Sequence, residues 1–221
     1  MDEPPVSLVL FDLDGTIADT ARDLFCALER LCKEESKQPP AYETFRSVVS
    51  QGSAAMLNLS FEGQLGNPHF DKLRDRLLTY YHQDIANHTV LFDGMSEVLD
   101  EFDDRGIKWG IVTNKPGWLT NPLLAKLDLD TRAICVIAGD TLARRKPHPD
   151  QLLHACELTG IAPSHSTYVG DARSDIVAGR RAGMRTIAVL FGYIPVDENP
   201  HTWGADIIIS TPTSLISWVN E

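Results

Sequence analysis

The sequence is short of positive charge. Its 221 residues include 20 lysines and arginines against 31 acidic residues, which gives a formal net charge of −11 at pH 7. A surface that binds nucleic acid or an anionic membrane needs clustered positive charge. The deficit therefore argues against nucleic-acid and membrane partners, although a small anionic ligand would respond only to the charge of its own site.

Long apolar segments and paired cysteines are also missing. No stretch approaches the roughly 18 consecutive apolar residues of a membrane-spanning helix, and no basic leader precedes an apolar segment at the N-terminus. We therefore expect a cytoplasmic protein. The four cysteines form no CxxC pair and no zinc-type spacing, so we expect structural thiols at Cys26, Cys32, Cys135 and Cys156.

What the chain does have is an alternation of strand-like and helix-like segments. Short apolar runs predict buried strands at 7–11, 107–112, 133–138, 166–169, 186–190 and 206–209. Helical patterns lie between the later runs, at 95–104, 119–127, 150–159 and 176–182. Such alternation is typical of an α/β fold, in which helices cover both faces of a parallel sheet.

The segment between the first two strands differs from the rest. Its apolar residues recur at helical spacing, and breaks at 39–40 and 63–68 divide it into about four helices. We therefore predict a helical domain at 20–87, inserted into a discontinuous α/β core domain formed by 1–19 and 88–221.

Four short motifs lie at or just beyond the ends of predicted strands. They are Asp-Leu-Asp-Gly-Thr at 12–16, Thr-Asn-Lys at 113–115, Arg-Lys-Pro at 145–147 and Gly-Asp-Ala-Arg-Ser-Asp at 170–175. Ligands of open α/β sheets bind at the carboxyl ends of the strands. We expect the four motifs to meet at that edge and to form the functional site.

Four carboxylates would then share a small volume, those of Asp12, Asp14, Asp171 and Asp175. Their mutual repulsion requires positive charge nearby. Lys146 supplies one charge, and oxygen ligands without neighbouring cysteine or histidine suit Mg²⁺. Four carboxylates, one Mg²⁺ and Lys146 together leave one negative charge. Protonation of one aspartate would make the site neutral, so that it could admit a phosphate dianion.

The order and context of the four motifs resemble the haloacid dehalogenase-like hydrolase superfamily over essentially the whole chain. GIVTNKP at 110–116 and YVGDARSDIVAGRRAGMRTIAVLFGYI at 168–194 are similar to its phosphoglycolate phosphatase group, which includes bacterial phosphatases of 2-phosphoglycolate and of N-acetylmuramic acid 6-phosphate. The resemblance implies a Rossmann-like parallel sheet core with an inserted all-helical cap domain. It also implies a Mg²⁺-dependent phosphatase that hydrolyses a small phosphorylated metabolite through an aspartyl-phosphate.

The resemblance also implies roles for the carboxylates. Asp12 looks like the nucleophile, and Asp14 looks like the general acid and base. Mg²⁺ would be held by Asp12, the backbone carbonyl of Asp14 and Asp171. Asp175 would act from outside the metal ligands by orienting a bound water or Lys146.

Phosphate binding is assigned to two other motifs in the same way. Thr113 and the backbone amide of Asn114 would hydrogen-bond the phosphoryl oxygens, and Lys146 would supply positive charge to them. The neighbouring His148, flanked by two prolines, is more simply a loop residue than a base.

Other interpretations remain open. Dehalogenases of the superfamily lack an aspartate two residues after the nucleophile, so Asp14 favours phosphoryl chemistry. A phosphomutase of the β-phosphoglucomutase type shares the capped architecture, whereas a noncatalytic binding protein would not need both Asp12 and Asp14. Each motif alone could be a turn or a helix cap. The chain could be a monomer or a homodimer.

Substrate choice is expected to lie in the cap. A glycine-bearing break between cap helices could project polar groups into the cleft, and its candidate residues are Arg46, Ser50, Gln51, Gly52 and Ser53. An ordinary turn between helices is the alternative interpretation of that stretch. A two-carbon phosphoglycolate would require a cation for its carboxylate, and a lactyl amino sugar would require room as well.

Overall fold

A computed structural model describes residues 6–219 of the protein. Its main sheet has six strands in the order β5-β4-β1-β6-β7-β8, and all neighbouring strands are parallel. These strands are β1 (Leu8–Phe11), β4 (Lys108–Val112), β5 (Val136–Ile137), β6 (Ser166–Gly170), β7 (Arg185–Val189) and β8 (Ile207–Ile209). The predicted α/β fold with a parallel sheet is confirmed.

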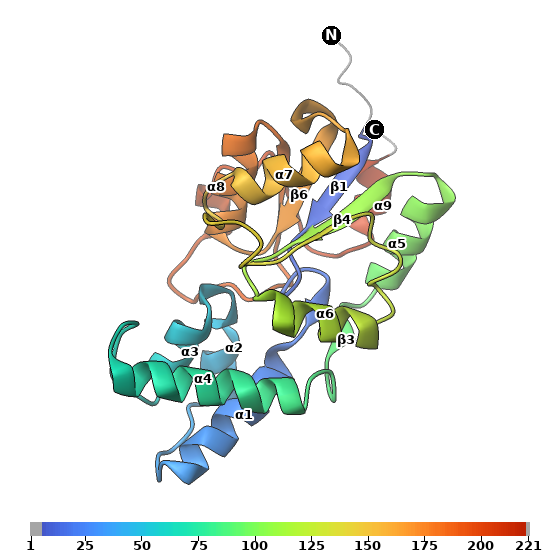
Figure 1. The fold of residues 1–221 in the computed structure, drawn as a ribbon. Coiled ribbons are helices and arrows are strands. Elements are labelled where there is room, and N and C mark those ends of the chain that lie inside the picture. The colour runs from blue at the N-terminus through green and yellow to red at the C-terminus, as the bar shows by residue number, and fades with distance from the viewer. Residues whose placement is uncertain (1–5, 220–221) are drawn as a thin grey trace.

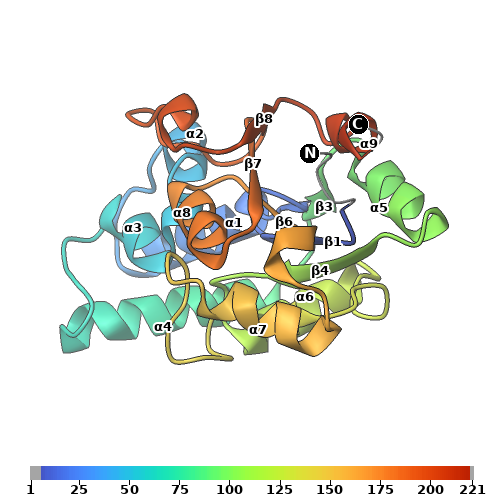
Figure 2. The same cartoon turned by 90° about the horizontal axis from the view of Figure 1, so that it is seen from above.

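Helices lie on both sides of this sheet (Figures 1 and 2). The helices of the α/β part are α5 (Met95–Asp104), α6 (Gly117–Lys126), α7 (Asp150–Thr159), α8 (Arg173–Ala182) and α9 (Ser214–Trp218). Among the described helices, none is long and apolar enough to cross a membrane.

Strand β1 shows why the sheet is covered on both faces. Leu8 and Leu10 belong to the apolar cluster formed with α7 and α8, whereas Val9 and Phe11 belong to the cluster that includes α5. Successive side chains of a strand point to opposite faces. All four side chains are fully buried and β1 is paired on both sides, so this strand lies in the middle of the core.

Four helices form the cap, which lies to one side of the sheet (Figure 1). They are α1 (Ala21–Glu34), α2 (Tyr42–Arg46), α3 (Ser53–Asn58) and α4 (Pro68–Gln83). Apolar residues of α1 and α4, including Leu28 and Leu77, pack in one buried cluster. The all-helical character of the insert is confirmed, while the division of domains at 19/20 and 87/88 stays a prediction.

A second, two-stranded sheet lies where the chain passes between core and cap. β2 (Ala18–Asp19) pairs antiparallel with β3 (Val90–Leu91). Asp23 of α1 holds the returning chain, because its carboxylate accepts hydrogen bonds from His88 N at 2.9 Å and Thr89 N at 2.8 Å. Strands of two residues have no periodicity, so the sequence pattern did not predict this sheet.

Some boundaries differ from the prediction. β5 is limited to Val136–Ile137 within the predicted run 133–138, and its pairing with β4 covers only these residues. Helices α6 and α8 begin at Gly117 and Arg173, earlier than predicted. The first three residues of α8 are polar, and α6 begins with Gly117 and the exposed Trp118, so these positions lie outside the buried apolar pattern used to find the helices.

Candidate active site

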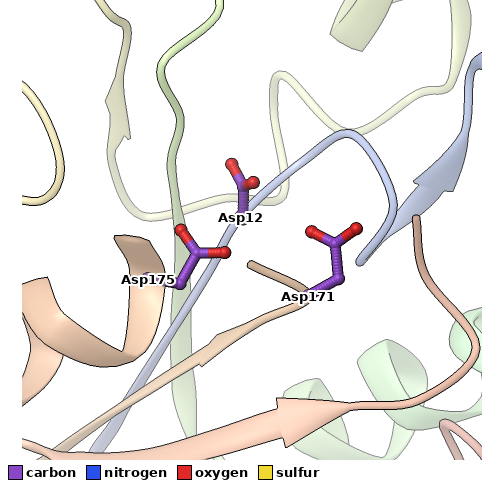
Figure 3. Close-up of side chains that lie close together, drawn as sticks. All are labelled: Asp12, Asp171 and Asp175. Carbon is purple, nitrogen blue, oxygen red and sulfur yellow. The ribbon is translucent and has the colours of Figure 1, made fainter. Parts of the chain in front are cut away.

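Three aspartates converge at the carboxyl end of the sheet (Figure 3). Asp12 follows β1, Asp171 follows the neighbouring strand β6, and Asp175 lies in the first turn of α8. Each offers one carboxylate oxygen, and these oxygens lie within 4.8 Å of one another. Two predicted motifs therefore meet at one sheet edge.

Two glycines make room for Asp171. Gly15 has a φ of +84°, and a side chain there would be strained and would clash with the Asp171 carboxylate. A Cβ on Gly192 would clash with Asp171 as well. The Asp171 carboxylate is thus packed directly against backbone, and it accepts hydrogen bonds at Oδ2 from Tyr193 N and Ser50 Oγ, both at 2.7 Å.

Lys146 is the cation inside this cluster. Its Nζ lies 2.9 Å from Asp12 Oδ1 and 2.8 Å from Asp175 Oδ1, and it donates to the Tyr168 hydroxyl at 2.7 Å. Burial disfavours a charged ammonium, but Asp12 and Asp175 outweigh burial and raise the pKa of Lys146. Lys146 therefore stays charged although its side chain is buried.

One lysine does not neutralise three carboxylates. Burial raises the pKa of Asp12 to about 6, although Lys146 partly opposes this shift. Burial, together with the charges of Asp175 and Asp12, raises the pKa of Asp171 well above its usual range. In the described part of the chain the buried Asp171 Oδ1 receives no hydrogen bond.

These residues fit a divalent cation. The donor set is made of oxygen atoms, it is crowded, and it carries more negative charge than Lys146 can balance. Asp175 also accepts a hydrogen bond from Ala172 N at 3.0 Å, so it helps to cap α8 as well as pairing with Lys146. Capping and a role in the site are therefore compatible.

Asp14 has a cation of its own, which we did not predict. Lys115 Nζ lies 2.8 Å from Asp14 Oδ1, and Thr20 Oγ1 donates to the same oxygen at 2.5 Å. The Lys115 ammonium also lies 4.5 Å from the centre of the Tyr81 ring, which belongs to cap helix α4. The predicted charge balance is corrected accordingly, because two lysines rather than one oppose the four carboxylates.

The Thr-Asn-Lys and Arg-Lys-Pro motifs are joined by a residue that sequence analysis missed. Gln151 is fully buried in the first turn of α7; its Oε1 accepts from Lys146 N at 3.1 Å, and its Nε2 donates to Thr113 O at 3.2 Å. Asn114 Nδ2 donates to Lys146 O at 3.1 Å. A glutamine at a helix start gives no sequence signal for such a role, since it is usually exposed there.

The predicted cap residues do not all lie in one place. Ser50, Gln51, Gly52 and Ser53 line the cavity above the aspartates, and Ser50 reaches Asp171. Arg46 does not line this cavity. Arg46 instead donates to the carbonyls of Gly192 and Phe191 at 3.3 and 3.4 Å, and lies 3.5 Å from Asp19 Oδ2.

The cavity itself has a volume of about 490 Å³ and lies between the core and the cap. All four predicted motifs contribute side chains to this cavity. The predicted site residues that line it are Asp12, Asp14, Thr113, Asn114, Lys146 and Asp175. His148 is exposed, as expected for a loop residue, and the four cysteines are free thiols.

This arrangement can be compared with known proteins. The sequence pattern of the haloacid dehalogenase-like hydrolases matches residues 9–189, which include all four motifs. The chain belongs to this family. A structural neighbour, described as a predicted phosphoglycolate phosphatase from Haemophilus somnus, has a TM-score of 0.87 with 23% identity and covers 98% of this chain and 99% of its own. It supports the haloacid dehalogenase-like fold.

Relatives in the family carry two different substrate names. An N-acetylmuramic acid 6-phosphate phosphatase from Pseudomonas aeruginosa is 40% identical over 209 residues, which cover 94% of this chain and 92% of the relative. A phosphoglycolate phosphatase from Xanthomonas campestris is also 40% identical, over 207 residues that cover 94% and 93%. This haloacid dehalogenase-like hydrolase is therefore a phosphoric monoester hydrolase.

Proposed function

We propose that the protein hydrolyses a small phosphate monoester, of the 2-phosphoglycolate or N-acetylmuramic acid 6-phosphate type, through an aspartyl-phosphate on Asp12. The observation that carries the proposal is the position of the Asp12 carboxylate. It lies 2.9 Å from the buried Lys146 ammonium and faces the same cavity as Asp14. A carboxylate nucleophile, a second carboxylate and a cation for phosphoryl oxygens are the groups that this chemistry needs.

The two carboxylates divide the chemistry. An oxygen of Asp12 attacks phosphorus as the bond to the leaving oxygen breaks, and Asp14 gives its proton to that oxygen. Water then attacks the aspartyl-phosphate and passes a proton to Asp14. The bond from phosphorus to Asp12 breaks, which releases phosphate and restores the Asp12 carboxylate and the protonated Asp14.

The remaining residues bind charge. Thr113, the Asn114 backbone amide and Lys146 would hold the phosphoryl oxygens, and all three residues line the cavity. Asp12, Asp171 and the Asp14 backbone carbonyl would hold Mg²⁺, while Asp175 orients Lys146 from 2.8 Å. When bound, Mg²⁺ supplies positive charge to the phosphate.

The size of the cavity favours the larger of the two substrate types. Pockets of roughly 300–1,000 Å³ enclose whole organic ligands. At about 490 Å³ this cavity falls within that range, and it exceeds what a two-carbon phosphate ester needs. Its cap side is lined by apolar side chains, those of Leu24, Val49, Met56, Leu65 and Leu78. A sugar phosphate with apolar substituents suits such a wall.

A substrate panel tests the proposal. Phosphate release and kcat/KM are measured for N-acetylmuramic acid 6-phosphate, 2-phosphoglycolate, β-glucose 1-phosphate and nucleoside monophosphates with Mg²⁺ present. We expect the highest kcat/KM for one of the first two. Conversion of β-glucose 1-phosphate to glucose 6-phosphate would instead identify a mutase, and no turnover of any ester would reject the proposal.

The nucleophile has its own control. Asp12→Asn should abolish turnover while the protein still unfolds cooperatively, because asparagine cannot form the acyl phosphate. Asp130→Asn makes the same change on an exposed residue outside the cavity and should leave kcat unchanged. Activity of Asp12→Asn close to that of the unmodified protein would contradict the mechanism.

A further inference from the structure

Arg74 is a cation of the cavity that comes from the cap and has no acidic partner among the described residues. Arg74 of α4 lines the cavity and is partly buried. Across residues 6–219 it forms no ion pair, and its one hydrogen bond runs from Nε to Ser53 Oγ at 2.9 Å. The two terminal nitrogens of the guanidinium are thus left without a protein acceptor.

The other cations of the cavity are paired with carboxylates or come from the core side. Lys146 is paired with Asp12 and Asp175, and Lys115 is paired with Asp14. Arg145 and Arg173 also line the cavity, but both are exposed and come from the core segments next to Lys146 and Asp171. They therefore belong to the phosphate end of the space.

One hydrogen bond and the position of Arg74 on α4 indicate where its guanidinium points. Ser53 holds Nε, so the fork of the guanidinium is turned away from Ser53. Leu78, four residues later on α4, lines the same cavity, which shows that this face of the helix looks into it. Arg76 lies on another side of α4 and pairs with Glu34 of α1 and with Glu35, which follows α1.

A free guanidinium fork matches a carboxylate, which it can bind through two parallel hydrogen bonds. A cation that faces an apolar wall without an acidic partner is costly unless an anion from outside completes it. The substrate phosphate is placed at the core end, beside Lys146. The anion that Arg74 meets must therefore be a second group of the substrate, away from its phosphate.

We infer that Arg74 binds a carboxylate of the substrate and that the enzyme selects phosphate monoesters that carry a carboxylate at the end remote from the phosphate. The inference rests on the proposed phosphatase function and adds a specificity residue to it. Ser53 is the positioning residue for Arg74. Both substrate types named above carry such a carboxylate, and a lactyl ether adds a methyl group for the apolar wall.

Matched substrates test the inference. N-acetylmuramic acid 6-phosphate and N-acetylglucosamine 6-phosphate differ by the lactyl ether with its carboxylate. Arg74→Gln should lower kcat/KM for the first by about 10- to 100-fold, mostly through KM, and for the second by less than about 3-fold. Arg74→Lys should restore part of the preference, since it keeps the charge but loses the fork.

Arg76→Gln is the matched control on the same helix. It removes an arginine that faces α1, so it can lower the melting temperature but should leave the ratio between the two substrates unchanged. If the unmodified enzyme prefers 2-phosphoglycolate, the same comparison is made between 2-phosphoglycolate and 2-hydroxyethyl phosphate, which lacks the carboxylate.

The outcomes separate the two proposals. Equal losses on both members of a pair, or no loss on the carboxylate member, would overturn the role of Arg74 while leaving the phosphatase proposal intact. An unmodified enzyme that does not prefer the carboxylate member would overturn the inference directly. Failure of the unmodified enzyme to hydrolyse any ester would reject the proposed function, and the inference with it.

Discussion

Lys115 Nζ and Asp14 Oδ1 lie 2.8 Å apart, although the two residues are 101 positions apart in the chain. Burial disfavours a charged Lys115, but Asp14 and Tyr81 outweigh burial and raise the pKa of the lysine. The ammonium is therefore a fixed charge that holds the proposed acid and base in place. Its contact with the Tyr81 ring connects that position to the cap.

Replacing this lysine should impair catalysis more than binding. In Lys115→Met, Asp14 keeps Thr20 as a partner but loses its cation, so we expect kcat to fall by about 100-fold with little change in KM. The loss should persist with an aryl phosphate whose leaving group needs no proton, because water still requires a base in the second step. Lys115→Arg keeps the charge and serves as the comparison; equal kcat in Lys115→Met and the unmodified enzyme would exclude the positioning role.

Metal binding should reverse the dependence of stability on pH. The raised pKa values of Asp12, to about 6, and of Asp171 mean that the folded protein without metal holds protons which the unfolded chain releases. The stability of the metal-free protein should therefore decrease as pH rises past about 6, since burial disfavours the ionised carboxylates, which also repel one another. Mg²⁺ binds the ionised forms, so it should raise the melting temperature more at pH 8 than at pH 5.

Thermal unfolding in Mg²⁺ and in EDTA at both pH values measures this effect. Asp171→Asn should lose most of the Mg²⁺-dependent shift. A shift of the same size at both pH values, or one unchanged in Asp171→Asn, would argue against the metal ligands assigned here. EDTA should also abolish phosphate release, and added Mg²⁺ should restore it.

The buried Gln151 should be important for both stability and catalysis. Gln151→Leu removes the side-chain hydrogen bonds to Lys146 N, Thr113 O and Ala138 O, and leaves these backbone groups without that partner. We expect the free energy of unfolding to fall by about 2–4 kcal/mol and kcat to fall more than KM changes. Urea unfolding and kinetics measure both, and Gln64→Leu in an exposed loop is the control. A loss of stability with unchanged kcat would limit Gln151 to a structural role.

The outcome for the sequence predictions follows from the physics of the sheet. Asp12 and Asp171 could be placed because each directly follows a short apolar strand, and parallel strands bring their carboxyl ends to one edge. Lys115 and Arg74 could not be selected in this way. Lys115 meets Asp14 across two loops of the core, and Arg74 meets Ser53 across two cap helices, so both pairings depend on tertiary packing that leaves no periodic signal in the chain.

Arg46 is a residue for which the sequence predicted a different role from the one its contacts indicate. As a predicted specificity residue it would contact substrate, whereas its guanidinium joins α2 to the loop after β7 through the carbonyls of Phe191 and Gly192. The Arg46 guanidinium also lies 4.8 Å from the centre of the Tyr193 ring. The backbone amide of Tyr193 donates a hydrogen bond to Asp171. These contacts hold the cap against the core rather than the substrate in the cavity.

Arg46→Gln should therefore change kcat/KM without changing substrate preference. We expect a decrease of about 3- to 10-fold on both N-acetylmuramic acid 6-phosphate and N-acetylglucosamine 6-phosphate, because the weakened junction affects how the cap closes over any substrate. The contrast with Arg74→Gln is the measurement: Arg74 should alter the ratio of the two kcat/KM values, and Arg46 should alter only their size. A ratio that changes in Arg46→Gln as much as in Arg74→Gln would place Arg46 against the substrate, as the sequence first suggested.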